Sequence, residues 1–389
     1  MFVTGVRVQC GSRMHAPDQQ WATARYRAVK ADAVIVAVDT DIGLVGYGEA
    51  SPYGHPRQIA DWVSWLAPGI VGHDVDEPAL VPGPTGSGGA FDRAIAGIDC
   101  ALWDLRGQSA GQPICRLLAA EPDLSVPVYA STGVGYDWRQ RPRDLVDDVL
   151  RCAAAGYRLA KVRLGTEWSW DSVSTERFLS LYDEVRSAVA DDGFQLAVDA
   201  NCRLSRDEGL ALARGLDERG ARWLEEPIAR DDCAGYALIN ESVEMPIAGG
   251  ECWSTVEQFR AFLDAGAYGI VQPDPGQCGI TGVLRIGRLA HRFGVALIPH
   301  SWHNGLMIMA SAHAVAALPN APMVEQCMVQ GPLQWGSVEG GSRVHRGVID
   351  IGLRPGLGVR LIDRFVQRYP YLDGPYNVEF SRAPIDPGS

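Results

Sequence analysis

The alternation of short apolar runs with longer amphipathic stretches, from about residue 124 onward, constrains the fold of this chain more than any other feature. The apolar runs include VPVYAS, LAKVRLG, QLAVDAN and VALIPH, and helix-like segments such as residues 206–220 and 255–267 lie between them. Strands that alternate with helices form βαβ units and a parallel sheet. Eight such runs within residues 124–327 fit a (β/α) barrel of about 250 residues better than an open doubly wound sheet.

Polar or ionisable residues stand at the ends of these runs, although a strand in a soluble protein has no structural need for them there. The carboxyl ends of barrel strands converge on one face, where barrel enzymes hold their active sites. We therefore predict that one face of the barrel gathers the following side chains: Ser131, Lys161, Arg163, Asp199, Asn201, Glu225, Glu251, Asp274, His300 and Glu325.

The first 122 residues have a different pattern. Residues 32–50 contain β-rich runs that are broken by the turn signal DTDIG, and residues 88–118 carry apolar side chains at helical spacing. This pattern predicts an α+β domain over residues 1–122, followed by the barrel domain over residues 123–355.

The composition excludes several classes of function. The formal net charge is −12 and there is no block of Lys and Arg, whereas a nucleic-acid partner requires a concentrated basic patch. No run of 18 apolar residues occurs, and the first residues lack the apolar core of a signal peptide. The nine cysteines are odd in number and never spaced as C-x-x-C, which favours free thiols in a reducing compartment. We expect a cytoplasmic protein with neither a nucleic-acid nor a membrane partner.

Three carboxylates end successive strands at equal steps of 26 residues: Asp199, Glu225 and Glu251. Neighbouring strand ends in a barrel bring such groups close together, where they repel one another unless a divalent cation neutralises them. A donor set of oxygen atoms without Cys or His favours Mg²⁺, with Mn²⁺ as a substitute, over zinc. The alternative is that Glu225 and Glu226 cap the helix that follows them.

Asp274 and His300 end two adjacent strands, which suggests a hydrogen-bonded pair. A carboxylate that accepts from one ring nitrogen of a histidine fixes its tautomer and raises the basicity of the other nitrogen. The alternative is that His300 is a core histidine. His303 could line the same pocket, and His313 lies inside a helical segment where a structural role is more natural.

Seven short motifs occur in order on consecutive strands: KVR, VDAN, LEEP, AGGE, QPD, PHSW and VEQ. Together they resemble the enolase superfamily, specifically its mandelate racemase branch. The segments GYGEA and AIAGIDCALWDLRG resemble the capping domain of that family, and residues 352–361 resemble its C-terminal return to the cap. The resemblance implies a (β/α)7β modified TIM barrel with an N-terminal α+β capping domain, which residues 356–389 complete.

The resemblance also implies a reaction. Mg²⁺ held by Asp199, Glu225 and Glu251 would bind the carboxylate of a small-molecule substrate, and abstraction of the α-proton would give a metal-stabilised enediolate. A bound cation stabilises the charge that develops in that transition state.

Roles for the remaining strand-end residues follow from the same resemblance. The His300–Asp274 pair is implied as the base, or as the acid toward a leaving hydroxide. Lys161 would contact the metal-bound carboxylate, and Glu325 would be an acid that hydrogen-bonds it. We expect the Glu325 carboxyl group, among so many anions, to hold its proton tightly.

The resemblance has one departure. The family pattern is Lys-x-Lys, and its second lysine is the base on the face of the substrate opposite the histidine; Arg163 stands at that position here. Arginine stays protonated, so it is a poor general base but a good fork for a carboxylate or a hydroxyl group. The alternative for Lys161 and Arg163 is an ordinary ion pair at a strand end. The sixth strand, QPDPGQCGITG, also lacks the lysine of the muconate-cycloisomerase-like enzymes and dipeptide epimerases.

With one competent base, His300, elimination is favoured over two-base racemisation. We therefore predict an acid-sugar dehydratase that converts an aldonate or aldarate into a 2-keto-3-deoxy acid. A sugar-lactone cycloisomerase, a racemase or epimerase of a 2-hydroxy acid, and a non-catalytic sensor of sugar acids remain as alternatives.

Substrate selection in the family falls to cap loops, which here correspond to residues 12–27 and 50–56. They carry His15, Trp21 and Tyr53, and such polar and aromatic groups favour a hydroxylated substrate unless they simply face solvent. Asn201 could bond a substrate hydroxyl group or start a turn. Relatives are generally oligomers, so we also expect a homo-oligomer.

Overall fold

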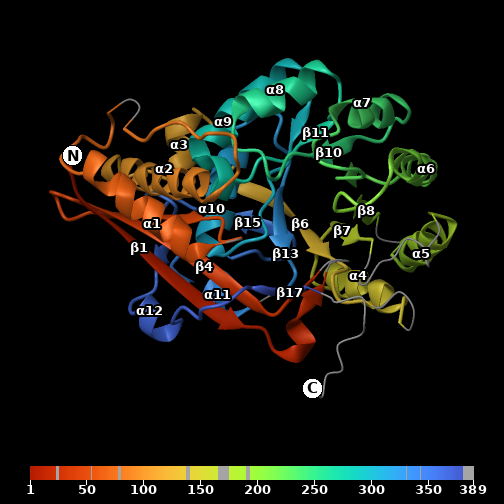
Figure 1. Ribbon diagram of the computed structural model, residues 1–389, viewed down its shortest axis with the longest axis horizontal. Coiled ribbons are helices and arrows are strands. Elements are labelled where there is room, and N and C mark those ends of the chain that lie inside the picture. The colour runs from red at the N-terminus through yellow and green to blue at the C-terminus, as the bar shows by residue number, and fades with distance from the viewer. Residues whose placement is uncertain are drawn as a thin grey trace.

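The computed structural model describes residues 1–389 except 23–25, 54, 78–79, 137–140, 165–174, 190–192, 330, 342 and 380–389. Parts of both predicted cap loops and the last ten residues of the predicted C-terminal segment therefore lie outside the described residues. Figure 1 shows a parallel barrel that is flanked on one side by a smaller sheet and its helices.

Eight parallel strands form the barrel in chain order, and the last of them pairs with the first. Each strand from β6 to β11 pairs with a parallel neighbour on both sides, and β12 and β13 are the two ends of this order. Their bounds are β6 (Ser125–Thr132), β7 (Leu159–Arg163), β8 (Gln195–Asp199), β9 (Leu224–Glu225), β10 (Ile247–Gly249), β11 (Ile270–Val271), β12 (Ala296–Leu297) and β13 (Val324–Cys327).

One helix follows each of the first seven barrel strands, which confirms the predicted (β/α)7β order. Ser205 and Thr255 start two of these helices with reciprocal capping boxes, so the sequence itself fixes where they begin. Figure 1 shows α5 to α8 along the outer side of the strands. The seven helices are α4 (Asp144–Ala154), α5 (Thr175–Ala188), α6 (Arg206–Asp217), α7 (Cys233–Glu241), α8 (Val256–Asp264), α9 (Pro275–Arg292) and α10 (Gly305–Ala316).

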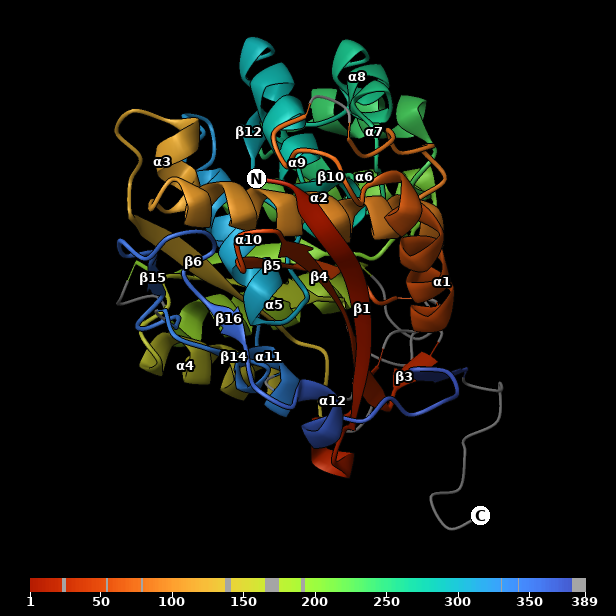
Figure 2. The same cartoon turned by 90° about the vertical axis from the view of Figure 1, so that its left-hand side faces the viewer.

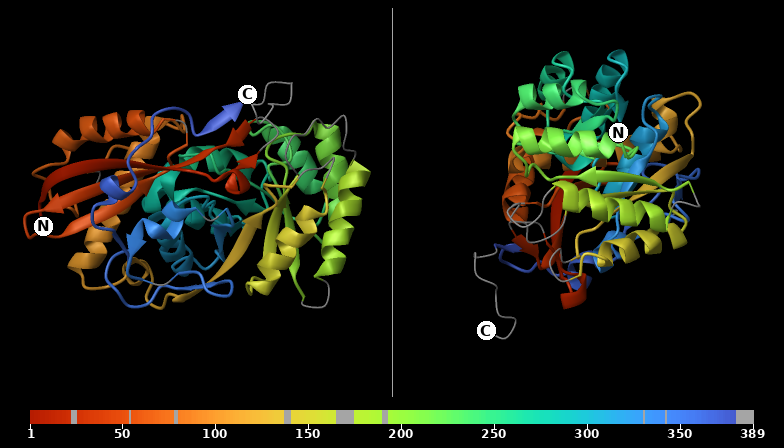
Figure 3. Two further views of the ribbon diagram at one scale, coloured as in Figure 1. Left: turned by 90° about the horizontal axis from the view of Figure 1, so that it is seen from below. Right: turned by 90° about the vertical axis from the view of Figure 1, so that its right-hand side faces the viewer.

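The cap is built on an antiparallel sheet of β1 (Val3–Met14), β4 (Lys30–Thr40) and β5 (Val45–Ala50). The helices α1 (Pro56–Leu66) and α2 (Ala90–Ser109) pack on it and enclose a second hydrophobic core. Figure 2 shows this sheet and its helices in front of the barrel, and Figure 3 shows the cap and the barrel side by side. Short elements complete the region: η1 (Pro17–Gln19), β2 (Trp21–Ala22), β3 (Tyr26–Ala28), η2 (Ala67–Gly69) and α3 (Ile114–Leu118).

The C-terminal segment returns to the cap. Its last strand, β17 (Asn377–Glu379), pairs with β3, and the backbone N–H of Leu357 donates to Asp104 of α2 over 2.7 Å. Before that return, β15 adds an antiparallel partner to β6. The remaining elements are α11 (Pro332–Gly336), β14 (Val338–Glu339), β15 (Val348–Asp350), β16 (Arg360–Leu361) and α12 (Phe365–Arg368).

Two further sequence expectations bear on the chain as a whole. All nine cysteines carry free thiols, as their spacing predicts. Among the helices that the structure describes, none combines the length and the apolar character that a membrane crossing would require.

Close packing explains the two glycines of the motif GYGEA. Gly46 and Gly48 point to the same side of β5, toward α2. A β-carbon at Gly48 would overlap the carbonyl oxygen of Gly97 and lie 2.6 Å from the backbone nitrogen of Ala101. The two glycines therefore allow the strand and the helix to approach closely.

We predict that Gly48→Ala lowers the free energy of unfolding by about 1–3 kcal/mol, because the added methyl group forces α2 away from the sheet. Denaturant unfolding followed by circular dichroism measures the change. Gly69→Ala is the matched control, since its β-carbon would meet nothing within 4 Å. Equal stability of the two variants would contradict this account of the motif.

Candidate active site

The inward-facing side chains of the barrel strands are apolar at one end and polar at the other. An apolar cluster inside the barrel includes Leu159, Ala197 and Trp223. Because side chains on a strand alternate with a period of two, the next inward positions are Lys161, Asp199 and Glu225. The polar residues at the strand ends therefore form a layer directly above an apolar floor, at the C-terminal mouth of the barrel.

Two of the predicted metal ligands lie in register, because Asp199 on β8 pairs with Glu225 on β9. Both side chains are 1% exposed. Burial raises the pKa of Glu225 to about 8; Lys161 opposes this rise, and the charges of Asp199 and Glu251 add to it. The carboxylates are thus close enough to disfavour one another's ionised forms.

Each of the three predicted ligands also lies near a basic side chain. Glu225 Oε1 lies 2.5 Å from Lys161 Nζ. Asp199 Oδ2 lies 3.5 Å from Arg163 Nε, and Glu251 Oε2 lies 3.4 Å from His300 Nε2. An oxygen-only donor set of mutually repelling carboxylates, two of them buried, fits a hard divalent cation.

The predicted triad does not itself form the tightest cluster of ligating groups. Within the ranges that the structure describes, the three side chains whose ligand atoms lie within 4.8 Å of one another are Asp274, His300 and His303. Asp274 Oδ2 lies 2.7 Å from His300 Nδ1 and 2.6 Å from His303 Nε2. These are hydrogen-bond lengths, and both bonds end on a single oxygen, so the group is a hydrogen-bonded His–Asp–His arrangement.

The sharing of Asp274 fixes both tautomers. An ionised carboxylate only accepts, so His300 carries its hydrogen on Nδ1 and His303 on Nε2. Although burial raises the pKa of Asp274, the two histidines outweigh that effect and lower it below the ordinary range. Burial lowers the pKa of His300, but the neighbouring carboxylates, first Glu251, raise it to about 10.

Lys161 occupies the floor of the mouth. Its Nζ lies 3.0 Å from Glu325 Oε1 in addition to its contact with Glu225. This corrects the expectation that Glu325 holds its proton tightly. Burial alone would raise the pKa of Glu325, but Lys161 and the His300 ring lower it below the ordinary value.

Arg163 is held between aromatic rings. Its guanidinium carbon lies 4.4 Å from the centroid of the Trp302 ring and 5.5 Å from that of Trp21. Indole faces attract a cation, and they add to the ionic contact with Asp199. The two cations on β7 therefore face carboxylates and aromatic rings, which offsets their mutual repulsion.

The catalytic cavity, as we name it here, has a volume of about 490 Å³. Asn201 lines it and donates its side-chain amide to Asp199 Oδ2 over 2.9 Å, so this residue orients a predicted metal ligand. The residues that line the cavity include Trp21, Tyr53, Arg93, Arg163, Asn201, Glu251, Asp274, Gln277, His300 and Trp302.

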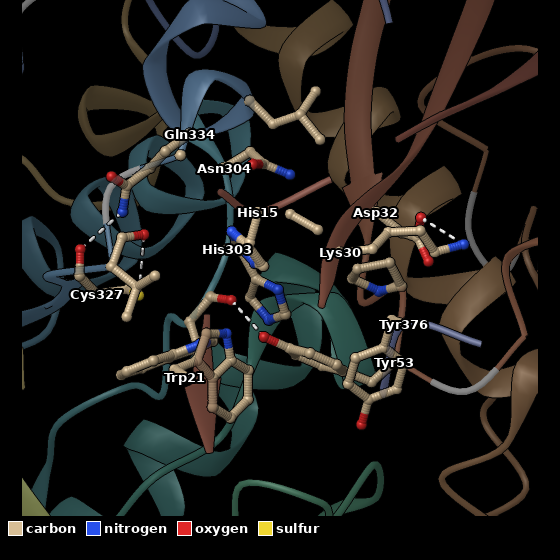
Figure 4. Close-up of a pocket in the computed structure, with 16 residues that line it drawn as sticks. His15, Trp21, Lys30, Asp32, Tyr53, His303, Asn304, Cys327, Gln334 and Tyr376 are labelled. Carbon is tan, nitrogen blue, oxygen red and sulfur yellow. Dashed lines mark hydrogen bonds and ion pairs between the residues drawn. The ribbon is translucent and has the colours of Figure 1, made fainter. Parts of the chain in front are cut away.

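A second, smaller cavity of about 60 Å³ lies beside it, between the cap and the barrel (Figure 4). Trp21 and Tyr53 line both cavities, and the Tyr53 hydroxyl donates to the carbonyl oxygen of Trp302 over 2.9 Å. His15 and His303 line only the smaller cavity. The structure therefore places His15 away from the catalytic cavity, while His303 reaches it only through Asp274.

Sequence reasoning missed two contacts, of which the alternation of inward-facing positions could have found the first. Gln272, two residues before Asp274, donates to Glu225 Oε2 over 2.6 Å. His303 shares Asp274 with His300, and the H-x-x-H spacing after the strand was its only signal.

The fold and this site together define a capped (β/α)7β barrel with an acidic mouth and a hydrogen-bonded His–Asp–His group. Two family models match the chain. Mandelate racemase / muconate lactonizing enzyme, N-terminal domain, covers residues 4–119, and enolase C-terminal domain-like covers residues 144–364. The chain belongs to this family of the enolase superfamily.

Individual relatives point to acid-sugar chemistry. D-galactarolactone cycloisomerase of Agrobacterium fabrum is 28% identical over 93% of this chain and 97% of its own length. Arabinonate dehydratase of Saccharolobus solfataricus is 29% identical over 87% of this chain and 90% of its own length. A racemase structure from Streptomyces coelicolor with bound magnesium is 26% identical, covers 94% of this chain and 98% of that one, and has a TM-score of 0.80.

We predict that Lys161→Met lowers the free energy of unfolding by about 3–5 kcal/mol in metal-free buffer, because it leaves Glu225 and Glu325 buried without their shared cation. Chemical denaturation measures the loss. The control is Arg206→Met, which breaks the exposed pair with Asp232 and should cost at most about 1 kcal/mol. A comparable loss in both variants would show that the buried pairing is not what matters.

Proposed function

We propose that this protein is a Mg²⁺-dependent acid-sugar dehydratase, which removes water from an aldonate or aldarate to give a 2-keto-3-deoxy acid. The observation that carries the proposal is the asymmetry of the catalytic cavity. His300, oriented by Asp274, enters from one side, whereas β7 contributes a guanidinium held by indole rings. One base and one permanent cation suit elimination better than inversion of a stereocentre.

Asp199, Glu225 and Glu251 are the residues that would hold Mg²⁺. The ion would supply positive charge to the substrate carboxylate, which makes the α-proton more acidic. Lys161, buried beside Glu225, adds a second positive charge at the floor of the mouth. These positive charges would stabilise the negative charge that develops on the carboxylate oxygens.

His300 is the group that moves the proton. Its Nε2 takes the α-proton from C2, while Nδ1–H stays bonded to Asp274. The same Nε2 then returns that proton to the hydroxyl group leaving C3, so that water departs and an enol remains. Tautomerisation of the enol gives the keto acid, and Arg163 holds the substrate by its hydroxyl or carboxylate oxygens throughout.

A lactone cycloisomerase is the second candidate, and the similarity to a galactarolactone cycloisomerase favours it. Ring opening of a lactone uses the same α-proton abstraction and also needs a single proton donor. The masses of substrate and product separate the two reactions, because dehydration of an acid sugar releases water, whereas ring opening of a lactone gives an isomer of the same mass.

We predict that His300→Asn lowers kcat by about 10²–10⁴-fold through loss of the base. Proton NMR in D₂O with a library of aldonates, aldarates and their lactones, together with a semicarbazide assay for 2-keto acids, measures it. His345→Asn, at an exposed histidine, is the control and should retain activity. Deuterium incorporation at C2 with inversion and without keto acid would overturn the dehydratase assignment.

We also predict that Mg²⁺ raises the melting temperature of metal-free wild-type protein, because the ion neutralises three carboxylates that repel one another. Glu251→Gln should reduce this shift strongly, whereas Glu241→Gln, at an exposed position on α7, should leave it unchanged. Differential scanning fluorimetry after chelation measures both. An undiminished shift in Glu251→Gln would place the ion elsewhere.

A further inference from the structure

Arg93 is a cation of the cap whose side chain lines the catalytic cavity. It lies in the first turns of α2, and its Nε donates to Gln277 of α9 over 3.2 Å. Gln277 stands three residues after Asp274, at the start of that barrel helix. The guanidinium therefore bridges the two domains where it lines the cavity, which Arg163 of β7 also lines.

The charge of Arg93 has no anionic partner within the residues that the structure describes. Among the described side chains, no carboxylate lies within ion-pair distance of Arg93, and the hydrogen bond of its guanidinium is the one from Nε to Gln277. By contrast Arg230, which lines the same cavity, pairs with Glu226 at 3.3 Å. Burial lowers the pKa of Arg93, which is the expected effect on a cation that is partly removed from water.

The acids nearest to Arg93 are already engaged. Asp92 accepts from the Ser254 hydroxyl over 2.8 Å and from the backbone of the loop before α2, including Thr85 N. Asp274 uses one oxygen for the two histidines and the other for Gly276 N. The Cys252 thiol lies nearby, but burial raises its pKa far above neutrality, so it carries no charge.

An unpaired guanidinium at the edge of a cavity costs free energy unless a ligand supplies the anion. Its planar fork matches a carboxylate in a bidentate geometry. The cavity volume of about 490 Å³ lies within the ordinary range for sites that bind small molecules. The cavity thus offers a substrate two cations from different domains, because Arg163 of β7 and Arg93 of α2 both line it.

We propose that Arg93 binds a second carboxylate of the substrate, so that the preferred substrate is an aldarate, with a carboxylate at each end, rather than an aldonate. This inference rests on the proposed function for the identity of the reacting end. It adds that the cap selects the substrate by charge, through a residue of α2 that lies outside the two predicted specificity loops.

The test compares galactarate with galactonate, which differ only in whether C6 is a carboxylate or a primary alcohol. Wild-type protein should have the higher kcat/KM for galactarate. Arg93→Met should lower kcat/KM for galactarate about 10- to 100-fold, chiefly through KM, and change that for galactonate less than about threefold. Arg93→Lys should recover part of the loss, and Arg116→Met, at an exposed arginine of the cap, should have no effect.

Calorimetric titration of galactarate into His300→Asn protein, with and without Arg93→Met, separates this inference from the proposed reaction. A weaker Kd with Arg93→Met supports the carboxylate site even if no turnover of any acid sugar is found. Equal losses for both sugars, or an unchanged Kd, would overturn the role of Arg93 and leave the dehydratase assignment standing.

Discussion

The balance between buried carboxylates and buried cations at the mouth of the barrel is the constraint on which the rest of the site depends. Lys161 lies against Glu225 and Glu325, and a second cation, Arg163, faces Asp199. A buried charge is tolerated only with a partner and with further hydrogen bonds. Gln272 supplies one of these by donating to Glu225. Replacing any one of these charged residues therefore leaves a neighbouring buried charge without its partner.

Glu251 connects this charge balance to the base. Its carboxylate lies 3.4 Å from His300 Nε2, and it is also the predicted ligand whose charge most raises the pKa of that ring. A cation bound to Glu251 would weaken that effect and make the unprotonated ring, which the first step requires, easier to reach. The reacting nitrogen and the predicted metal site are thus coupled by a single side chain.

Much of this architecture could be predicted from the sequence, because it follows from periodicity. The alternation of strands and helices predicts the barrel, and the period of two along each strand predicts that Lys161, Asp199 and Glu225 point inward above Trp223. The protonation of Glu325 could not be predicted, since it depends on which neighbour lies closest. The pattern shows anions around it, whereas the structure places Lys161 Nζ 3.0 Å away.

The positions of loop residues could not be predicted from the sequence either. His15 and Tyr53 both belong to predicted cap loops, yet only Tyr53 lines the catalytic cavity. His303 shares Asp274 because the chain turns just after β12, and no periodic rule places a side chain beyond the end of a strand. Contacts made by loops depend on how two domains meet, and that information is spread over the whole interface.

Arg163 stands where the Lys-x-Lys pattern of the family has a lysine, and the aromatic rings around it fit an arginine. Trp302 comes from the barrel and Trp21 from the cap, so both domains supply aromatic faces to one guanidinium. These faces and the carboxylate of Asp199 attract the positive charge of the guanidinium. A lysine at this position could titrate and act as a base, but this guanidinium is held as a fixed cation. In the proposed reaction, Arg163 therefore holds the substrate on the face of the α-carbon toward β7, and the proton leaves toward His300.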